Sequence, residues 1–351
     1  MIRSRLFSLA VAGAAAAVVL PAGLAAAPAV ASPGAAVPAA ACTWRLDTRL
    51  PLPAGVTSAV ISSTDGVADF AGFASPAGGG IVGIVWRAGQ PSVLPTPVGW
   101  LTFANGMNGR GDVVGTGHSP AGLDVPVLWR GGQMIELGVA PGISAQAQDI
   151  NDAGLIVGST FERATGRRRG IIWSAAEPGK FSYVTAPGAD NDLRSVTEDG
   201  TLAGMYFDDA VPGRSVPAAG TVAAGLHALA LPAGTDNGHA IAARGTFIAG
   251  TAQKGVADAH AVLWQNGVPT DLAKAGTTVD GVNSAGTVVG YNLTTRQAVV
   301  WSGGAEQPLP TSISGPATTT AQVGVITDTG AVGGWVVTSA GDELPVVWHC
   351  V

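Results

Sequence analysis

A glycine that closes a short apolar run recurs along the chain at a nearly constant spacing. The residues that lead to it read NGRGDVVG from Asn108, NDAGLIVG from Asn151 and NSAGTVVG from Asn283, and looser copies occur elsewhere. Seven closing glycines are separated by 43, 43, 46, 46, 40 and 44 residues. They are Gly72, Gly115, Gly158, Gly204, Gly250, Gly290 and Gly334. Self-similarity at such a period predicts a repeat architecture in which each copy is one supersecondary unit.

A second anchor keeps the same spacing, because an apolar run ending in tryptophan follows the glycine in every copy except the fourth. The fourth copy has Gly220 at that position. The six tryptophans are Trp86, Trp129, Trp173, Trp264, Trp301 and Trp348. Since they share one strand position, we expect them to pack between repeats rather than to stack on sugars. Trp44, Trp100 and Trp335 lie outside this register and are better candidates for exposed binding platforms, although core packing is the simpler expectation for them too.

Each copy divides into four short segments rich in Val, Ile, Phe and Trp. In the third copy these segments are AQAQDIN, LIVGSTF, RRGIIWS and KFSYVTA, separated by turn residues. Such runs are typical of strands and hairpins. Four strands in each repeat of this length indicate a blade of a β-propeller. We therefore predict an all-β fold, a seven-bladed β-propeller with four-stranded blades. The expected blades are 56–100, 101–144, 145–190, 191–236, 237–276, 277–316, and 317–351 together with 42–55.

The two ends of this region predict how the ring closes. The chain ends on LPVVWHCV, which is a third strand without a fourth, and CTWRLDTRLPLP near the start has the character of the missing strand. Pairing of these segments would complete the last blade. It would also bring together Cys42 and Cys350, the two cysteines of the chain. Neighbouring strands lie about 4.8 Å apart, so we predict a Cys42–Cys350 disulfide, which suits an exported protein.

The first 31 residues have the pattern of a secretory signal peptide. Arg3 and Arg5 precede the apolar run 6–20, and the small-residue site AVA follows before Ser32. The run is short, rich in alanine and broken by Pro21, so we expect cleavage rather than a retained membrane span. Residues 32–41 form an expected flexible leader, and 42–351 a single domain. The sequence thus predicts a secreted, extracellular monomer.

The charge of the chain excludes two classes of partner. Loss of residues 1–31 removes two arginines and changes the formal net charge from −6 to −8. No basic stripe is present. An acidic chain without a positive patch is a poor candidate for binding nucleic acid or an anionic membrane surface. The basic segment RATGRRR at 163–169 is either a solvated loop or a local anion contact.

The repeat resembles that of the secreted HAF-repeat proteins of bacteria, whose unit runs roughly "aINdaGqIVG … HAFLW". INDAGLIVG at 150–158 matches the first element best, and HAVLW at 260–264 is a near copy of the second. Elsewhere the histidine of the second element is replaced, for example by Gln297 and Pro345. That element is therefore no functional site here. The resemblance covers nearly all of the chain after the leader and implies export and fold, but no particular activity.

The repeated motif carries no recognisable chemistry of its own. It lacks the lysine of a phosphate-binding loop, the following helix of a dinucleotide site and the alternating carboxylates of a calcium loop. Asn, Asp and Gly instead favour tight turns. The five histidines do not have metal-site spacing, and no GxSxG motif occurs. We therefore expect no cofactor and no metal, and we interpret the carboxylate pairs Asp190/Asp192 and Asp208/Asp209 as solvated loop acids.

Candidate binding residues come from a position of the repeat that varies. Three residues before the Asn or Thr anchor, five of the seven copies carry different polar side chains: Asn105, Gln148, Arg194, His239 and Asp280. The first strand of a propeller blade is normally innermost, so this column should line the central channel. Either it forms a specific asymmetric site, or the channel is filled with water and lined by unrelated polar groups.

Two functions are compatible with this pattern. The first is a non-enzymatic extracellular binding or scaffold module with a glycan or protein partner. The alternative is a secreted hydrolase or lyase whose active site lies in the channel. In that case His239 and Asp280 would be the acid/base pair, within about 3–6 Å of each other or of one shared pocket, and Arg194 would bind an anionic substrate.

Overall fold

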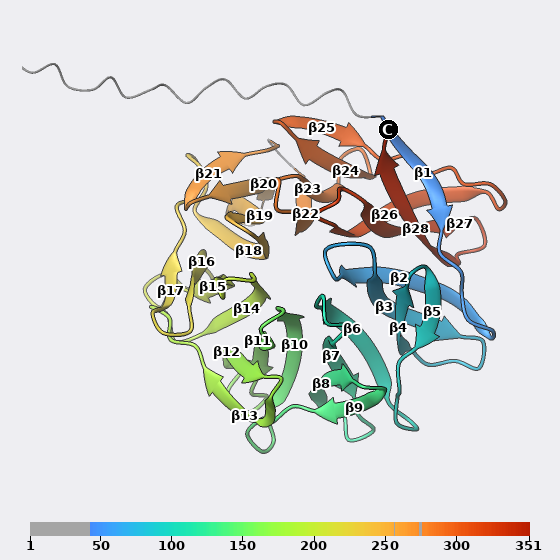
Figure 1. The fold of residues 1–351 in the computed structure, drawn as a ribbon. Coiled ribbons are helices and arrows are strands. Elements are labelled where there is room, and N and C mark those ends of the chain that lie inside the picture. The colour runs from blue at the N-terminus through green and yellow to red at the C-terminus, as the bar shows by residue number, and fades with distance from the viewer. Residues whose placement is uncertain (1–42, 256, 274–275) are drawn as a thin grey trace, which may run out of the picture. The chain divides into compact units, whose positions relative to one another are not determined.

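The computed structural model describes residues 43–255, 257–273 and 276–351. Every regular element in these ranges is a strand, and the strands form seven four-stranded antiparallel sheets arranged in a ring (Figure 1). The predicted all-β, seven-bladed propeller is confirmed. Among the described residues no helix is long and apolar enough to cross a membrane. The signal peptide at 1–31 and the leader at 32–41 lie outside the described residues.

Each blade contributes one strand to each of four concentric positions. The inner strands are β2 (Val56–Thr64), β6 (Leu101–Met107), β10 (Ser144–Ile150), β14 (Asn191–Val196), β18 (Asn237–Arg244), β22 (Thr277–Val282) and β26 (Thr318–Ile326). The second strands are β3 (Phe70–Pro76), β7 (Val113–His118), β11 (Leu155–Phe161), β15 (Leu202–Phe207), β19 (Phe247–Lys254), β23 (Val288–Asn292) and β27 (Val332–Thr338). The third strands are β4 (Val82–Arg87), β8 (Asp124–Arg130), β12 (Arg168–Ser174), β16 (Ser215–Thr221), β20 (Ala257–Gln265), β24 (Gln297–Ser302) and β28 (Glu343–Cys350). The outer strands are β5 (Gln90–Val93), β9 (Gln133–Glu136), β13 (Glu177–Tyr183), β17 (Gly225–Ala228), β21 (Val268–Asp271), β25 (Ala305–Pro308) and β1 (Trp44–Arg49).

The ring closes as the sequence predicts, through the strand nearest the N-terminus. β1 pairs antiparallel with β28, with Arg45 opposite His349. The backbones of Thr43 and Val351 continue this pairing with N–O distances of 3.2 and 3.1 Å. Cys42 lies outside the described residues, so the disulfide stays a prediction.

The closing glycine and the tryptophan of each repeat belong to one packing arrangement. A Cβ on Gly158 would lie 1.9 Å from the carbonyl oxygen of Gln146 and 3.0 Å from the ring of Trp173. Only glycine therefore fits between the inner strand and the indole. Trp173 is buried, and its indole N–H donates to the carbonyl of Gly138, in the segment that enters the blade, at 2.6 Å. Packing between repeats is thus the role of these tryptophans, while Trp44, Trp100 and Trp335 are only partly buried.

The asparagine of the repeated motif connects adjacent blades. Its side-chain oxygen accepts the N–H of Leu155 at 2.9 Å, which closes the turn after Asn151. Its amide donates to the carbonyl of Thr197, at the equivalent position of the next blade, at 2.9 Å. Asn108 makes the same bond to the carbonyl of Asn151 at 3.0 Å, and the Asp152 carboxylate accepts the N–H of Gly109 at 2.7 Å. The motif is a turn, as predicted, and also an interblade connection.

Candidate binding site in the central channel

Every inner strand contains a β-bulge at the same position. In β10, Ala147 pairs with Gly158 and Asp149 pairs with Val157, which leaves Gln148 as an extra residue. A bulge bends its strand and redirects a side chain. The seven extra residues form a set that we name the channel ring. They are Ser62, Asn105, Gln148, Arg194, Ile241, Asp280 and Gly324.

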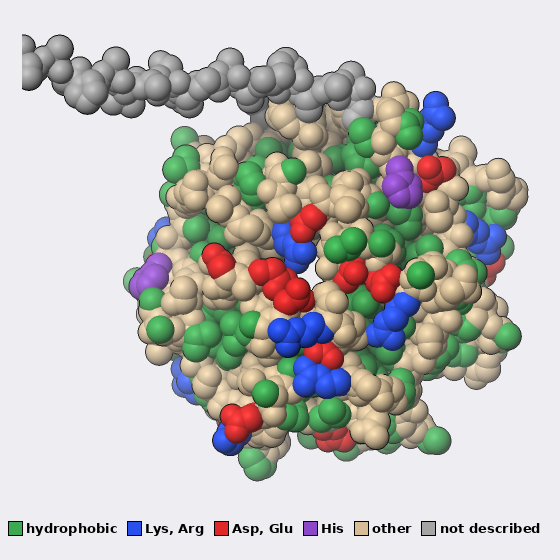
Figure 2. Space-filling model, viewed as in Figure 1, with side chains coloured by type: hydrophobic (Ala, Val, Ile, Leu, Met, Phe, Trp, Pro, Cys, Tyr) green, Lys and Arg blue, Asp and Glu red, His purple; other side chains and the backbone are tan. Residues whose placement is uncertain are grey.

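All seven residues of the channel ring line one cavity of about 150 Å³ at the centre of the propeller. Asn105, Gln148 and Arg194 also line a second hollow of about 380 Å³, which extends to Phe103, Gln146 and the paired side chains of His118 and Asp124. The two spaces therefore adjoin each other at these three side chains. On the face shown in Figure 2 the centre of the ring is open, and acidic and basic side chains surround the opening.

Four of the five residues that the sequence places in the channel lie in the channel ring, and His239 does not. His239 pairs with Thr251, two residues before the bulge residue Ile241. It therefore lies outside the ring, at the strand position that Gln146 and Asp192 occupy in their own blades. Counting residues back from the turn gives the wrong position in blade five. This blade has a tight hairpin, with Arg244 paired to Phe247, in place of the longer turn of the motif.

Arg194 is neutralised by a buried carboxylate beside it. Its Nη2 donates to Asp192 Oδ2 at 3.0 Å, and Asp192 also accepts a hydrogen bond from Ser159. Burial raises the pKa of Asp192, whereas the positive charges of Arg194 and Arg168 act in the opposite direction. The interpretation of Asp192 as a solvated loop acid is wrong. It lies in β14 with 1% of its surface exposed, because Arg194 and Ser159 satisfy its oxygens there.

Asp280 has no such partner. It forms no hydrogen bond or ion pair with any residue in the described part of the chain. The side chain reaches the channel water but is otherwise surrounded by protein, and burial raises its pKa to about 7. No hydrogen bond or ion pair joins His239 to it. Burial and the charge of Arg194 lower the pKa of His239, while the charge of Asp192 acts to raise it.

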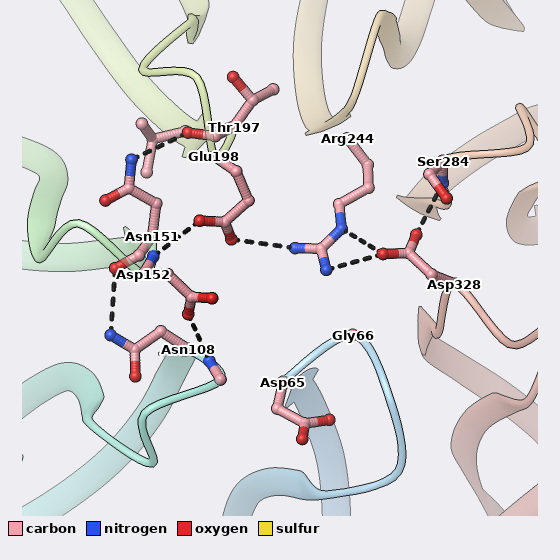
Figure 3. A network of polar contacts seen from close by, with 12 residues as sticks. Asp65, Gly66, Asn108, Asn151, Asp152, Thr197, Glu198, Arg244, Ser284 and Asp328 are labelled. Carbon is pink, nitrogen blue, oxygen red and sulfur yellow. Dashed lines mark hydrogen bonds and ion pairs between the residues drawn. The ribbon is translucent and has the colours of Figure 1, made fainter.

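A guanidinium group lies over one end of the channel (Figure 3). Arg244, at the end of β18, donates from Nε to Asp328 at 2.9 Å and reaches Glu198 with Nη1 at 3.5 Å. Gly66 of blade one approaches so closely that a Cβ there would lie 2.0 Å from Nη2 of Arg244. Four blades therefore meet at this side chain. Although burial opposes it, hydrogen bonds from Arg244 and Ser284 lower the pKa of Asp328.

Asp149 also lines the cavity, although sequence analysis does not identify it. Its carboxylate accepts hydrogen bonds from Ser195 Oγ at 2.7 Å and from the N–H of Val196 at 3.0 Å, while burial raises its pKa. Ser195 Oγ in turn accepts the N–H of Ala243 at 3.1 Å, so blades three, four and five are linked. Asp149 follows the bulge residue, and a bulge sets two successive residues against one partner, which simple strand alternation does not anticipate.

The basic segment at 163–169 is exposed: residues 163–167 connect β11 to β12, and Arg168 and Arg169 begin β12. Arg168 lies 5.3 Å from the ring centroid of Phe161, and Arg169 lies 3.7 Å from that of Tyr183. Arg167 approaches Asp190 at 3.7 Å. The predicted solvated loop covers residues 163–167, and a contact with an anion stays a prediction. Across the described ranges, no group of three or more His, Cys, Asp or Glu side chains could hold a metal ion.

Known proteins resemble this chain in fold and not in sequence. No protein-family model and no curated protein matches it. The puromycin-hydrolyzing peptidase of Mycobacterium tuberculosis is similar in structure, with a TM-score of 0.55 at 10% identity over 83% of this chain and 50% of that one. The β-propeller domain of the Trilobed protease from Pyrococcus furiosus has a TM-score of 0.55 at 8% identity over 84% of this chain and 97% of that domain. This chain spans half the length of the peptidase, and at such identities the likeness shows the fold alone.

Proposed function

We propose that this chain is an exported, non-enzymatic binding module, and that its central channel binds part of an extracellular glycan or protein. The signal pattern at the N-terminus and the resemblance to HAF-repeat proteins support export, and we assign the chain to that group on the same grounds. We further propose that it acts as a monomer. The observation that carries the binding proposal is the contrast between a repeated framework and a non-repeated channel ring.

The framework repeats from blade to blade, except that blade four has Gly220 in place of the tryptophan. The closing glycine, the tryptophan and the bulge recur because they determine how strands and blades pack. The bulge positions instead present two amides, a hydroxyl, a cation, an anion, an apolar side chain and a glycine, each on a rigid strand. An enclosed space with a few polar groups fixed in an asymmetric order is suited to hold one ligand in one orientation.

The test is a binding screen of the purified protein against a panel of glycans, cell-wall fragments and extracellular proteins. A triple variant, Arg194→Ala with His239→Ala and Asp280→Ala, should lose binding to any ligand found, because it removes the cation and the anion of the ring and the imidazole next to it. A variant of the exposed Asp342, Asp342→Ala, serves as the control. If the triple variant remains folded and binds as the wild type does, the channel is not the site.

One observation favours the second function, a secreted hydrolase or lyase. A carboxyl group with a pKa of about 7 is suited to accept and return a proton near neutral pH. The measurement is turnover of chromogenic glycoside, ester and peptide substrates. Activity that falls at least about a hundredfold in Asp280→Asn, as loss of a general acid or base requires, would favour the enzyme. Binding without product formation would favour the binding module.

A further inference from the structure

The polar residues of the channel ring differ in whether the protein itself satisfies them. Arg194 is paired with Asp192. Ser62 Oγ donates to the carbonyl of Ala104 at 2.6 Å. The amide of Asn105 donates to the carbonyl of Ala147 at 2.8 Å, and that of Gln148 to Gln146 at 3.1 Å. Asp280 alone among the polar ring residues has no partner on the described residues.

The neighbours of Asp280 in the ring leave space beside it and offer it no donor. Ile241 precedes it and is apolar, and Gly324 follows it without a side chain. Gly324 cannot be replaced easily, because a Cβ there would lie 2.1 Å from the carbonyl oxygen of Ile61. Close packing of blades one and seven therefore keeps this side of Asp280 open.

We propose that the channel binds a small organic cation, an ammonium or guanidinium group, that pairs with the carboxylate of Asp280. This inference rests on the proposed function, since it names the ligand class of the same site. Asp280 is exposed to the channel and its carboxylate has no partner among the described residues, so a cation that enters the channel can form a charge-assisted hydrogen bond with it. The cavity of about 150 Å³ admits an amine or guanidine head group, while the wider hollow of about 380 Å³ leaves room for the rest of a ligand.

The charges around the cavity disfavour the other ligand classes. An anion would meet the carboxylates of Asp149 and Asp280. The guanidinium groups of the lining are already paired, Arg194 with Asp192, and Arg244 with Asp328 and Glu198. A metal ion would require several ligating side chains, and the described ranges hold no group of three or more His, Cys, Asp or Glu that could bind one. A monovalent organic cation matches the single charge of the Asp280 carboxylate.

The titration of Asp280 gives the interaction a pH dependence. With a pKa of about 7 the free carboxyl is largely protonated at pH 6, and it must lose that proton to pair with a cation. The affinity should therefore fall about tenfold for each pH unit below 7 and be constant above about pH 8. The other ionisable groups that line the cavity are Asp149, Arg194 and Arg244, and those of the second hollow are His118 and Asp124. Asp192 and His239 lie two residues before the bulge on their strands. Burial and the charge of Arg194 lower the pKa of His239, which favours its neutral ring, and Arg194 and Arg244 are paired with carboxylates.

The experiment titrates four small probes into the methyl-labelled protein and follows the Ile241 methyl signals by NMR. Propylammonium and methylguanidinium are the cations, propanol is the neutral match and propionate the anion. Asp280→Asn is the test variant. Asp342→Asn is the control, because Asp342 is an exposed acid between β27 and β28. The two cations should shift the Ile241 signals in the wild type and the control, and bind at least about tenfold more weakly to Asp280→Asn.

The outcomes separate this inference from the proposed function. Two results would overturn the proposal that the ligand is a cation, while leaving the channel as a binding site. One is equal binding of propylammonium to the wild type and Asp280→Asn, and the other is stronger binding of propionate or propanol than of the cations. An affinity that does not change between pH 6 and 8 overturns the role of the Asp280 carboxylate. If no probe moves the Ile241 signals and no ligand of the screen does so either, both proposals fail.

Discussion

Replacing Asp280 with asparagine should stabilise the protein above about pH 4, by an amount that grows until about pH 7 and is constant at higher pH. In the folded chain burial raises the pKa of this carboxyl from 3.8 to about 7, whereas in the unfolded chain it keeps the lower value. The folded state therefore binds the proton more tightly than the unfolded state. The resulting contribution to stability is fully present below pH 4 and is lost as the pH rises to 7. Asparagine has the same shape and does not ionise, so the stability of the variant does not fall in this way as the pH rises.

The size of the effect follows from the difference between the two pKa values. Each unit corresponds to about 1.4 kcal/mol, so a difference of about three units has an upper limit of about 4 kcal/mol. The side chain still reaches the channel water, which screens the charge. We therefore expect about half of that limit, about 2 kcal/mol, at pH 8. At pH 4 the two proteins should unfold at the same urea concentration.

The assay is urea unfolding of the wild type and Asp280→Asn at pH 4, 6, 7 and 8, followed by tryptophan fluorescence. A parallel thermal series should show a shift of roughly 2–4 °C at pH 8 in favour of the variant. A difference in unfolding free energy that is constant with pH would refute the argument, because it would show that the carboxyl titrates normally. A less stable variant at pH 8 would mean that the carboxylate has a partner in the fold.

Three further variants test other contacts. Gly158→Ala should lower the unfolding free energy by about 3 kcal/mol or more, because its Cβ would overlap a backbone oxygen. Gly179→Ala is the control: no atom lies within 4 Å of the added Cβ, so the unfolding free energy should change by less than about 0.5 kcal/mol. Asn151→Ala should cost about 2 kcal/mol in urea unfolding, since it leaves buried backbone groups of two blades without partners. Arg244→Ala should raise the pKa of Asp328, as followed by NMR of the carboxyl carbon, because it removes the guanidinium that favours the carboxylate. An unchanged pKa would contradict the placement of Arg244 over the channel.

The blade number, the strand count and the closing strand can be predicted from the sequence, because they depend on residues that recur. Gly158 and Trp173 can each be recognised by position alone, since the same steric requirement returns in almost every blade. The channel is harder to predict, because the bulge breaks the alternation on which face assignments rest. Counting back from the anchor finds Gln148 but misses Asp149 beside it, and fails at His239, where the turn is shorter.

The interactions around Arg244 could not be predicted either, but the reason is different. Its partners come from blades four and seven, and Gly66 from blade one, so the residues that meet there are far apart in the chain. No local pattern connects them. They are brought together only by the closure of the ring, which sets the distance across the channel. The unpaired state of Asp280 likewise depends on which side chains the neighbouring blades happen to present.

The pairing of β1 with β28 has a consequence for how the chain reaches its native state. Arg45 and His349 are among the first and last described residues, and they lie opposite each other. Closing a loop of that length costs roughly 5 kcal/mol in chain entropy, and contacts so distant in sequence slow folding. β1 therefore cannot pair until β28 has been synthesised. Six blades can form as the chain elongates, but the seventh, and with it a continuous wall around the channel, is complete only after β28 has been synthesised.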